Sequence, residues 1–164
     1  GISKVGIITK SNYRSLMDHL GAGKPWDLSR KLDGMFILPP FSGAGANGVY
    51  QCRIEALYGS LGFMKRCTEE YVVMCDCNVV CNMDFGNLFE AHRASGADIT
   101  IAYKHGTAPA LDDFMTFEFD ADGTITGASV LNSRAKDTDF SLNIFVMRKS
   151  LLERLVTAEE TVFW

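Results

Sequence analysis

The chain has 164 residues, of which 47% are hydrophobic and 22% are charged, so it can bury a core and fits a single domain. Its net charge of −4 excludes a general nucleic-acid-binding surface, because such surfaces need clustered lysine and arginine to replace the counterions around phosphates. No run of about 18 apolar residues is present to span a bilayer, and no charged-then-apolar leader is seen, so we expect a cytoplasmic protein without membrane contacts.

The first hundred residues alternate between short apolar runs and helical periodicity. The pattern predicts strands at residues 5–9, 35–38, 71–75 and 97–103, and helices at residues 13–20, 50–61 and 85–95. Ser11 and Gly21 are suited to begin and end the first helix, and Gly96 is suited to end the third. This alternation of strands and helices predicts an α/β fold.

After residue 104 the alternation stops, and strands follow one another. They are predicted at residues 114–120, 124–131 and 141–147, with a hairpin turn at 120–123 between the first two. Ser150 and Glu153 match a capping box that would open a last helix. We therefore expect one α/β domain with a mixed, mostly parallel central sheet and helices on both faces.

The strand predicted at residues 71–75 runs directly into the polar triplet Asp76-Cys77-Asn78. In open α/β sheets ligands bind beyond the carboxyl ends of the strands, so a carboxylate and an amide arriving together are candidates for holding a metal ion or a phosphate. The alternative is a loop that only caps the following helix.

The cysteines stand at Cys52, Cys67, Cys75, Cys77 and Cys81, and their odd number does not suit a secreted disulfide framework. A zinc site on Cys75, Cys77 and Cys81 would need a fourth ligand, and no Cys-x-x-Cys pair is present. Small apolar side chains on buried strand positions are the simpler interpretation.

Residues 43–48 read Gly-Ala-Gly-Ala-Asn-Gly and match the dinucleotide-binding pattern Gly-x-Gly-x-x-Gly. A dinucleotide-binding domain is therefore one alternative, with Asp76 at the end of the next strand. In that fingerprint the first glycine closes the strand, whereas residues 39–42 intervene here, which favours a surface loop.

Two segments carry a resemblance to a known family that extends over nearly the whole chain. The first reads VGIITK at residues 5–10, RSLMDHLG at 14–21 and KPWDL at 24–28, and the second reads YVVMCDCNVVCNMDF at 71–85 and GADITIA at 96–102. They resemble the nucleotidyltransferase domain of bacterial glucose-1-phosphate adenylyltransferase, also called ADP-glucose pyrophosphorylase. The match is closest to its D-type regulatory subunit, and it implies a Rossmann-like, GT-A-like nucleotidyltransferase fold.

The resemblance implies a role in glycogen synthesis, where ATP and glucose 1-phosphate give ADP-glucose and pyrophosphate with the help of Mg²⁺. It also implies that residues 1–164 are a single partial domain. The phosphate loop that opens family members would precede Gly1, and the C-terminal β-helix domain would follow Trp164.

Site residues carry over from the resemblance one position at a time. A metal-binding aspartate of active members falls on Asn78, and a lysine that contacts the sugar phosphate falls on Leu131. A family segment Gly-Ile-Tyr, which lies near the sugar, aligns with residues 143–145 and so begins at Asn143. A family loop that reads Arg-Gly-Thr-Ala aligns with residues 47–50, where only the glycine is kept, as Gly48. The candidates for nucleotide or sugar binding are therefore Gly48, Asp76, Asn78 and Asn143.

The loss of an anion at Asn78 and of a cation at Leu131 predicts a catalytically degenerate site, because each charge would stabilise the transition state. Such a subunit would be inactive or weakly active alone. It would assemble with a catalytic adenylyltransferase subunit, or with itself, and adjust activity through the interface.

Two other hypotheses remain open. An active adenylyltransferase could hold Mg²⁺ with Asp76 and use Arg134 or Lys136 in place of the lost lysine, although such loop charges are more often solvated. A cysteine-bound metal or redox module predicts stoichiometric zinc in the purified protein.

Overall fold

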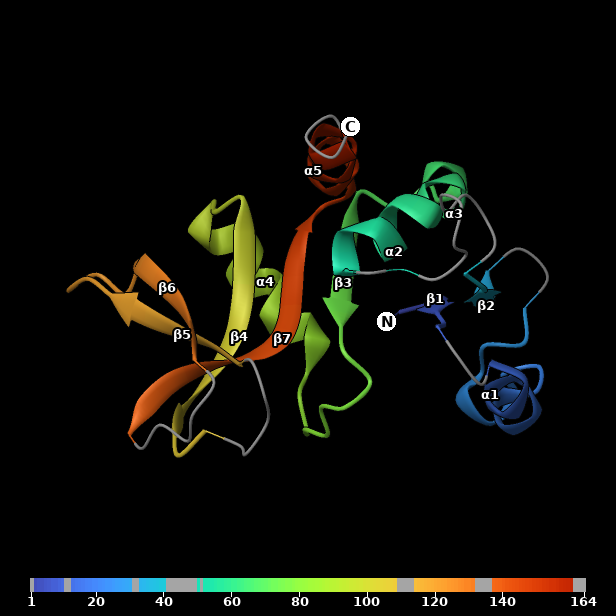
Figure 1. Ribbon diagram of the computed structural model, residues 1–164, viewed down its shortest axis with the longest axis horizontal. Coiled ribbons are helices and arrows are strands. Elements are labelled where there is room, and N and C mark those ends of the chain that lie inside the picture. The colour runs from blue at the N-terminus through green and yellow to red at the C-terminus, as the bar shows by residue number, and fades with distance from the viewer. Residues whose placement is uncertain are drawn as a thin grey trace. The chain divides into compact units, whose positions relative to one another are not determined.

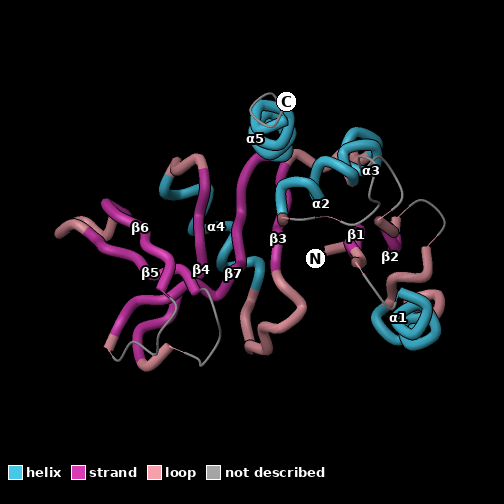
Figure 2. The backbone as a smooth tube through the Cα atoms, viewed as in Figure 1, coloured by secondary structure: helices cyan, strands magenta, loops and turns pink. Residues whose placement is uncertain are grey.

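The computed structural model describes residues 2–10, 13–30, 33–40, 50, 52–108, 114–131 and 137–160. The chain divides into two compact units, of which the first combines residues 1–70 with 149–164 and the second is residues 71–148. Figure 1 labels the helices and strands, and Figure 2 distinguishes them from the loops. Among the described residues, no helix has the length and apolar character needed to cross a membrane.

The first unit contains β1 (Lys4–Ile8), α1 (Tyr13–Leu20), the short 3-10 helix η1 (Lys24–Trp26), β2 (Gly34–Leu38), α2 (Arg53–Gly59), α3 (Leu61–Arg66) and α5 (Lys149–Glu160). The strands β1 and β2 are parallel, with Lys4 opposite Gly34. Gly21 takes the left-handed conformation at φ 53°, and its amide donates to the carbonyl of Met17 at 2.8 Å. The predicted end of the first helix is therefore confirmed, whereas its predicted cap, Ser11, lies outside the described residues.

The single helix predicted at residues 50–61 is two helices, α2 and α3, that meet at Ser60. The hydroxyl of Ser60 donates to the carbonyl of Ala56 at 2.9 Å, a side-chain bond that bends helices. Its amide donates to the carbonyl of Leu57, which tightens the last turn of α2. Tyr50 was expected on this helix but precedes it, and its buried ring contacts Gly59.

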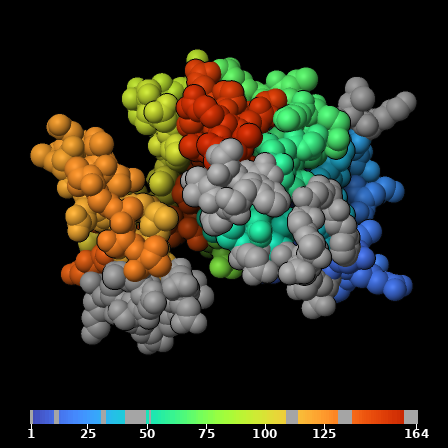
Figure 3. All heavy atoms as spheres, turned by 45° about the horizontal axis from the view of Figure 1, so that its top comes forward, coloured from blue at the N-terminus to red at the C-terminus, as the bar shows by residue number. Residues whose placement is uncertain are grey.

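Helix α5 packs against α2 and α3 within the first unit, and in Figure 3 its atoms appear in red beside the green atoms of those helices. It begins at Lys149, whose backbone amide donates to the carbonyl of Glu70 at 2.8 Å. Ser150 therefore lies inside the helix. The predicted capping box of Ser150 and Glu153 is wrong, because the helix begins one residue before Ser150 and its first amide, that of Lys149, donates to the backbone carbonyl of Glu70.

The second unit contains β3 (Tyr71–Cys75), α4 (Phe85–Ser95), β4 (Ile99–Gly106), β5 (Phe114–Phe119), β6 (Ile125–Leu131) and β7 (Thr138–Arg148). The long strand β7 pairs antiparallel with β3, β4 and β5, and β5 pairs antiparallel with β6. Helix α4 packs against β4 and β7, as Figure 1 shows. The core of this unit centres on β7, where Ile144 is 2% exposed and Val146 is fully buried.

The turn of the predicted hairpin is confirmed. A carboxylate oxygen of Asp120 accepts the amides of Asp122 and Thr124 at 3.0 and 2.8 Å, which closes the turn between β5 and β6. The left-handed Gly96, at φ 65°, confirms the predicted end of α4.

The expected mostly parallel sheet does not appear in the described strands, where β1–β2 is the one parallel pair. Helix α4 joins β3 to β4, but these two strands are not neighbours in the sheet. Instead β7 lies between them and runs antiparallel to both. Hydrophobic periodicity identifies each strand, but it does not indicate the order of the strands in the sheet. It therefore could not show that β7, the last of the described strands, pairs between β3 and β4.

Candidate functional site

Strand β7 changes its neighbour where β3 ends. Residues 144–148 pair with β3, and the last of these pairs sets Ile144 opposite Cys75. Phe140, earlier in β7, pairs with Thr116 of β5. Places where neighbouring strands part are common ligand sites, because backbone and side chains there are not covered by another strand.

The other side of β7 is irregular at the same place. Two consecutive residues of β4 pair with Ser141 and Ile144, so Leu142 and Asn143 form a bulge. Bulges bend a strand and re-aim its side chains, and they are frequent beside functional sites. The end of β3 and the bulge of β7 therefore define one candidate site in the second unit.

Asn143 adopts a left-handed backbone conformation, with φ 53°, in the interior of a strand. The hydroxyl oxygen of Ser141 accepts its backbone amide at 2.9 Å, and the same hydroxyl donates to its side-chain oxygen at 3.4 Å. Asparagine tolerates this conformation better than most residues. The amide nitrogen of its side chain is a hydrogen-bond donor, a group that can bind an oxygen atom of a ligand.

Asp76 and Asn78 occupy the chain just beyond β3. Asp76 directly follows Cys75, the last residue of β3 that pairs with β7, and Asn143 directly precedes its partner Ile144. In an extended strand, two residues spaced like Asp76 and Asn78 would lie on the same face. Here the strand ends at Cys75 and the chain turns at residues 77–78, so Asp76 and Asn78 do not share a face in this way. The Asp76 side chain is half-buried and that of Asn78 is exposed.

The residue that caps α4 is Asp84 and not a member of the triplet Asp76-Cys77-Asn78. A carboxylate oxygen of Asp84 accepts the amide of Gly86 at 2.8 Å, which satisfies one free donor in the first turn of the helix. The alternative role of the polar triplet, as a cap for the following helix, is therefore wrong.

Of the remaining candidate site residues, the structure describes Leu131 alone. Leu131 ends β6 and pairs with Phe114, the first residue of β5. Phe114 and Leu142 pack in one apolar cluster. Gly48, Arg134 and Lys136 lie outside the described residues, as does the glycine-rich loop that suggested a dinucleotide site.

The donors at the end of β3 do not fit a divalent cation. No group of three histidine, cysteine, aspartate or glutamate side chains within the described ranges could hold a metal ion. Asn78 offers an amide oxygen without negative charge, whereas Mg²⁺ prefers carboxylate and phosphate oxygens. We therefore derive no catalytic step through Mg²⁺ from these residues.

The cysteines differ from the expectation of buried, inert side chains. Cys52, Cys75, Cys77 and Cys81 are exposed free thiols, and Cys67 is half-buried. Partial burial of its sulfur, followed by the charges of Asp76, Cys81 and Cys77, raises the pKa of Cys75. The described residues give no support to the zinc interpretation.

Sequence reasoning missed the role of Ser141. It is 8% exposed and holds the backbone of Asn143, a contact that the pattern Ser-x-Asn could have suggested, because serine often bonds to the amide two residues on. It also missed an exposed cluster at the start of β7, where His105 contacts Asp139 at 3.0 Å and Asp137 at 3.5 Å.

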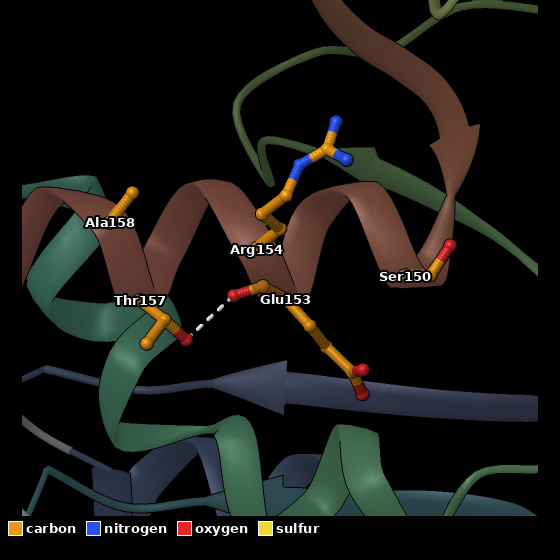
Figure 4. Close-up of a pocket in the computed structure, with 5 residues that line it drawn as sticks. All are labelled: Ser150, Glu153, Arg154, Thr157 and Ala158. Atoms are coloured by element: carbon orange, nitrogen blue, oxygen red, sulfur yellow. Dashed lines mark hydrogen bonds between the residues drawn. The ribbon is translucent and has the colours of Figure 1, made fainter.

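A shallow groove on α5 belongs to the first unit. It is lined by Ser150, Glu153, Arg154, Thr157 and Ala158, which Figure 4 shows along one side of the helix. The hydroxyl of Thr157 donates to the backbone carbonyl of Glu153 at 2.7 Å. One carboxylate oxygen of Glu153 is buried without a hydrogen-bond partner among the described residues. No sequence pattern marked this groove as functional.

Comparison with curated proteins places the chain among enzymes of one name. It is 31% identical to glucose-1-phosphate adenylyltransferase of Thermotoga neapolitana over 98% of this chain and 38% of that protein. It is 27% identical to the enzyme of the same name from Clostridium kluyveri over 98% of this chain and 42% of that protein. The chain thus spans about 40% of the length of these relatives.

A second kind of relative matches part of the chain at higher identity. The glycogen biosynthesis protein GlgD of Geobacillus stearothermophilus is 40% identical over 61% of this chain and 29% of that protein. No protein-family model matches the chain.

Among solved structures, HddC from Yersinia pseudotuberculosis, complexed with GMP-PN, aligns with a TM-score of 0.59. The alignment covers 93% of this chain and 59% of that one at 12% identity. This likeness shows the fold alone.

Proposed function

Because the chain belongs to the glucose-1-phosphate adenylyltransferase family, we propose that it is part of a subunit that serves glycogen synthesis and is itself catalytically degenerate. The subunit would bind ATP, glucose 1-phosphate or ADP-glucose weakly and adjust the activity of a catalytic homologue with which it assembles. We also propose that the chain forms the core of a Rossmann-like, GT-A-like nucleotidyltransferase domain, in the cytoplasm.

The observation that carries the proposal is the composition of the turn after β3. Asn78 stands there, at the position where the resemblance places a metal-binding aspartate, and no metal-holding group occurs among the described residues around it. Two negatively charged substrates must approach each other in this reaction. Without a cation held nearby, their repulsion opposes transfer by several kcal/mol, roughly the contribution of a Lewis-acid metal.

The partner follows from the same reasoning. A subunit that cannot perform the transfer affects the pathway only by changing a subunit that can. We therefore propose a catalytic adenylyltransferase subunit as its partner, with self-assembly as the alternative. Mg²⁺ would be required by the catalytic partner rather than by the residues described in this chain.

The decisive experiment measures ADP-glucose formation from ATP and glucose 1-phosphate, at fixed Mg²⁺, by the intact protein alone and after mixing with a catalytic homologue. We expect no turnover alone and altered kcat or KM in the mixture. Robust turnover by the protein alone would contradict degeneracy. Unchanged kinetics of the homologue, with no complex by size-exclusion chromatography, would contradict the regulatory role.

One specific observation favours a second candidate, an active enzyme that uses Asp76 for the metal. Asp76 is half-buried and directly follows Cys75, whose partner Ile144 directly follows the bulge of β7. If this candidate were correct, Asp76→Asn would abolish turnover that the unmodified protein shows alone. If the degenerate subunit is correct, the same substitution has no turnover to remove.

A further inference from the structure

Strand β6 forms an edge of the sheet in the second unit. The strands follow the order β3-β7-β5-β6, so among the described strands β6 pairs with β5 alone. Figure 1 shows β5 and β6 in orange. The amides and carbonyls along a free strand edge are open to pairing with another strand, and proteins usually protect such edges with charged side chains, proline or irregular backbone.

Strand β4 carries this protection, and β6 does not. Among the described strands β4 pairs with β7 alone, but it exposes the basic side chains of Lys104 and His105, and its register shifts in the middle. In contrast, β6 reads ITGASVL, without a charged residue or a proline. Its register shifts at its start, between Ile125 and Gly127, and residues 127–131 pair regularly with β5. The edge formed by residues 127–131 is therefore suited to binding a strand.

Apolar side chains are exposed on β6 and beside it. Ile125 and Val130 of β6 are 40% and 60% exposed. Ile125 pairs with Phe119 of β5, and the centroid of the Phe119 ring lies 4.8 Å from that of Tyr103, which is itself half exposed. Apolar side chains exposed next to one another mark surfaces that bind other protein molecules. A strand added to β6 would cover part of this surface.

The charges before and after β6 fit a second copy of this chain. The acidic residues Asp120 and Asp122 precede the strand, and the basic residues Arg134 and Lys136 follow it in the sequence. Two copies of one strand that pair antiparallel about a two-fold axis set the beginning of each strand beside the end of the other. Acidic and basic residues of the two copies would therefore approach each other. Asp137, the next acidic residue, already contacts a histidine of β4.

We propose that β6 pairs antiparallel with β6 of a second copy of this chain, so that one sheet continues across the two copies. Full overlap of the regular residues 127–131 sets Ser129 opposite itself and Ala128 opposite the partner's Val130. Both copies use the same edge, so assembly through this edge ends at two copies. A pair of short strands is a small interface, so the association is reversible and depends on concentration. The inference goes beyond the proposed function and does not rest on it.

Two double variants of the intact protein test the pairing and its register. Ala128→Lys with Val130→Lys places two lysines opposite each other at two symmetric places in the interface. Ala128→Lys with Val130→Glu places a lysine opposite a glutamate at the same two places. Both side chains are exposed in the single chain, so the variants are expected to fold, and circular dichroism checks this. The two variants differ only in the sign of one charge.

Sedimentation equilibrium over a range of protein concentrations measures the mass of each assembly. We expect the unmodified protein to dissociate on dilution, and the lysine–lysine variant to have half its mass at the same concentration. Its dissociation constant should exceed that of the lysine–glutamate variant about tenfold, because like charges directly opposite each other destabilise a strand pair. The added lysines reduce the net charge of −4, so a general charge effect would favour association instead. High salt should narrow the difference.

Four results would overturn the proposal. They are an unmodified protein that stays monomeric at every concentration, two variants that associate as well as the unmodified protein, two variants that dissociate equally, and a complex that forms only with the catalytic homologue. Turnover does not enter these masses. A failure of the proposed function is therefore distinguishable from a failure of the pairing at β6.

Discussion

Ser141 and Asn143 hold each other within β7, because one serine hydroxyl accepts the asparagine amide at 2.9 Å and donates to its side-chain oxygen at 3.4 Å. This pair stabilises a left-handed residue at the point where β7 leaves β3 and approaches β5. The bulge is therefore stabilised by hydrogen bonds within the strand itself. It directly precedes Ile144, which pairs with the last residue of β3, and this makes the end of β3 a candidate site.

Substitutions of Asn143 should show whether its left-handed backbone conformation is under constraint. Both Asn143→Gly and Asn143→Ala lose the side-chain bond to Ser141, but Asn143→Gly should be more stable than Asn143→Ala by about 1 kcal/mol, because glycine adopts φ 53° without strain. Urea denaturation of the intact protein measures the difference between the two. If alanine is tolerated as well as glycine, the backbone at Asn143 is not under constraint.

Restoring a carboxylate tests the degenerate site. Asn78→Asp should raise the affinity for Mg²⁺ about tenfold, or about 1.4 kcal/mol, because hard cations prefer charged oxygens. Calorimetric titration with Mg²⁺ measures it. The matched control is Asn82→Asp, which adds the same charge to an exposed position of the same loop. An equal gain in both variants would mean that only net charge matters and would contradict a residual metal position at residue 78.

Lys149 should stabilise the first unit. Its ammonium group donates to the carbonyl oxygens of Met64 and Cys67 at the end of α3, of which the Met64 oxygen also accepts the amide of Cys67. Lys149→Met should cost about 1–3 kcal/mol, the usual range for hydrogen bonds from charged groups. Lys104→Met, at an exposed strand position, is the control and should change little. Equal stability of the two variants in urea would rule out this capping role.

Lys4 should link stability to pH at both extremes. It forms ion pairs with Glu69 at 2.9 Å and with Asp33 at 3.4 Å. The hydrogen bond from Lys4 lowers the pKa of Glu69, and the bond to Glu69 raises the pKa of Lys4.

The sign of each contribution follows from these shifts. The stability due to Glu69 is present above its ordinary pKa of about 4.3 and is lost as the pH falls through its lower folded-state pKa. The stability due to Lys4 is present below its ordinary pKa of about 10.4 and is lost as the pH rises through its higher folded-state pKa. The difference in unfolding free energy between the unmodified protein and Lys4→Met should therefore be largest between these limits. It should shrink in high salt, and a difference independent of pH would contradict the ion pairs.

Two glycines should respond to alanine in opposite directions. A methyl group on Gly6 would lie 2.7 Å from the Phe63 ring and 3.2 Å from a Leu38 methyl, so Gly6→Ala should cost about 1–3 kcal/mol. A methyl group on Gly62, inside α3, would meet only Arg66 at 4.0 Å. Gly62→Ala should therefore stabilise the protein by about 0.5–1 kcal/mol. Thermal unfolding of both variants compares them, and a Gly6→Ala variant as stable as the unmodified protein would refute the packing at Gly6.

Local features of the fold could be predicted because residues a few positions apart determine them. Gly21 and Gly96 end their helices in the left-handed conformation, and Asp120 closes its turn with its own carboxylate. The break at Ser60 escaped prediction because apolar periodicity is the same in one bent helix and in two short ones.

The sequence by itself determined the α/β character, most element positions, the family resemblance and the polar triplet after β3, all of which depend on neighbouring residues. Only the tertiary structure decided that β7 inserts between β3 and β4, and that β7 bulges at Asn143 next to its last pair with β3. It also decided that the cysteines of the loop after β3 are exposed rather than buried. These features depend on pairing between segments far apart in the chain, whose free energy comes from long-range packing and hydrogen bonds that no local pattern records.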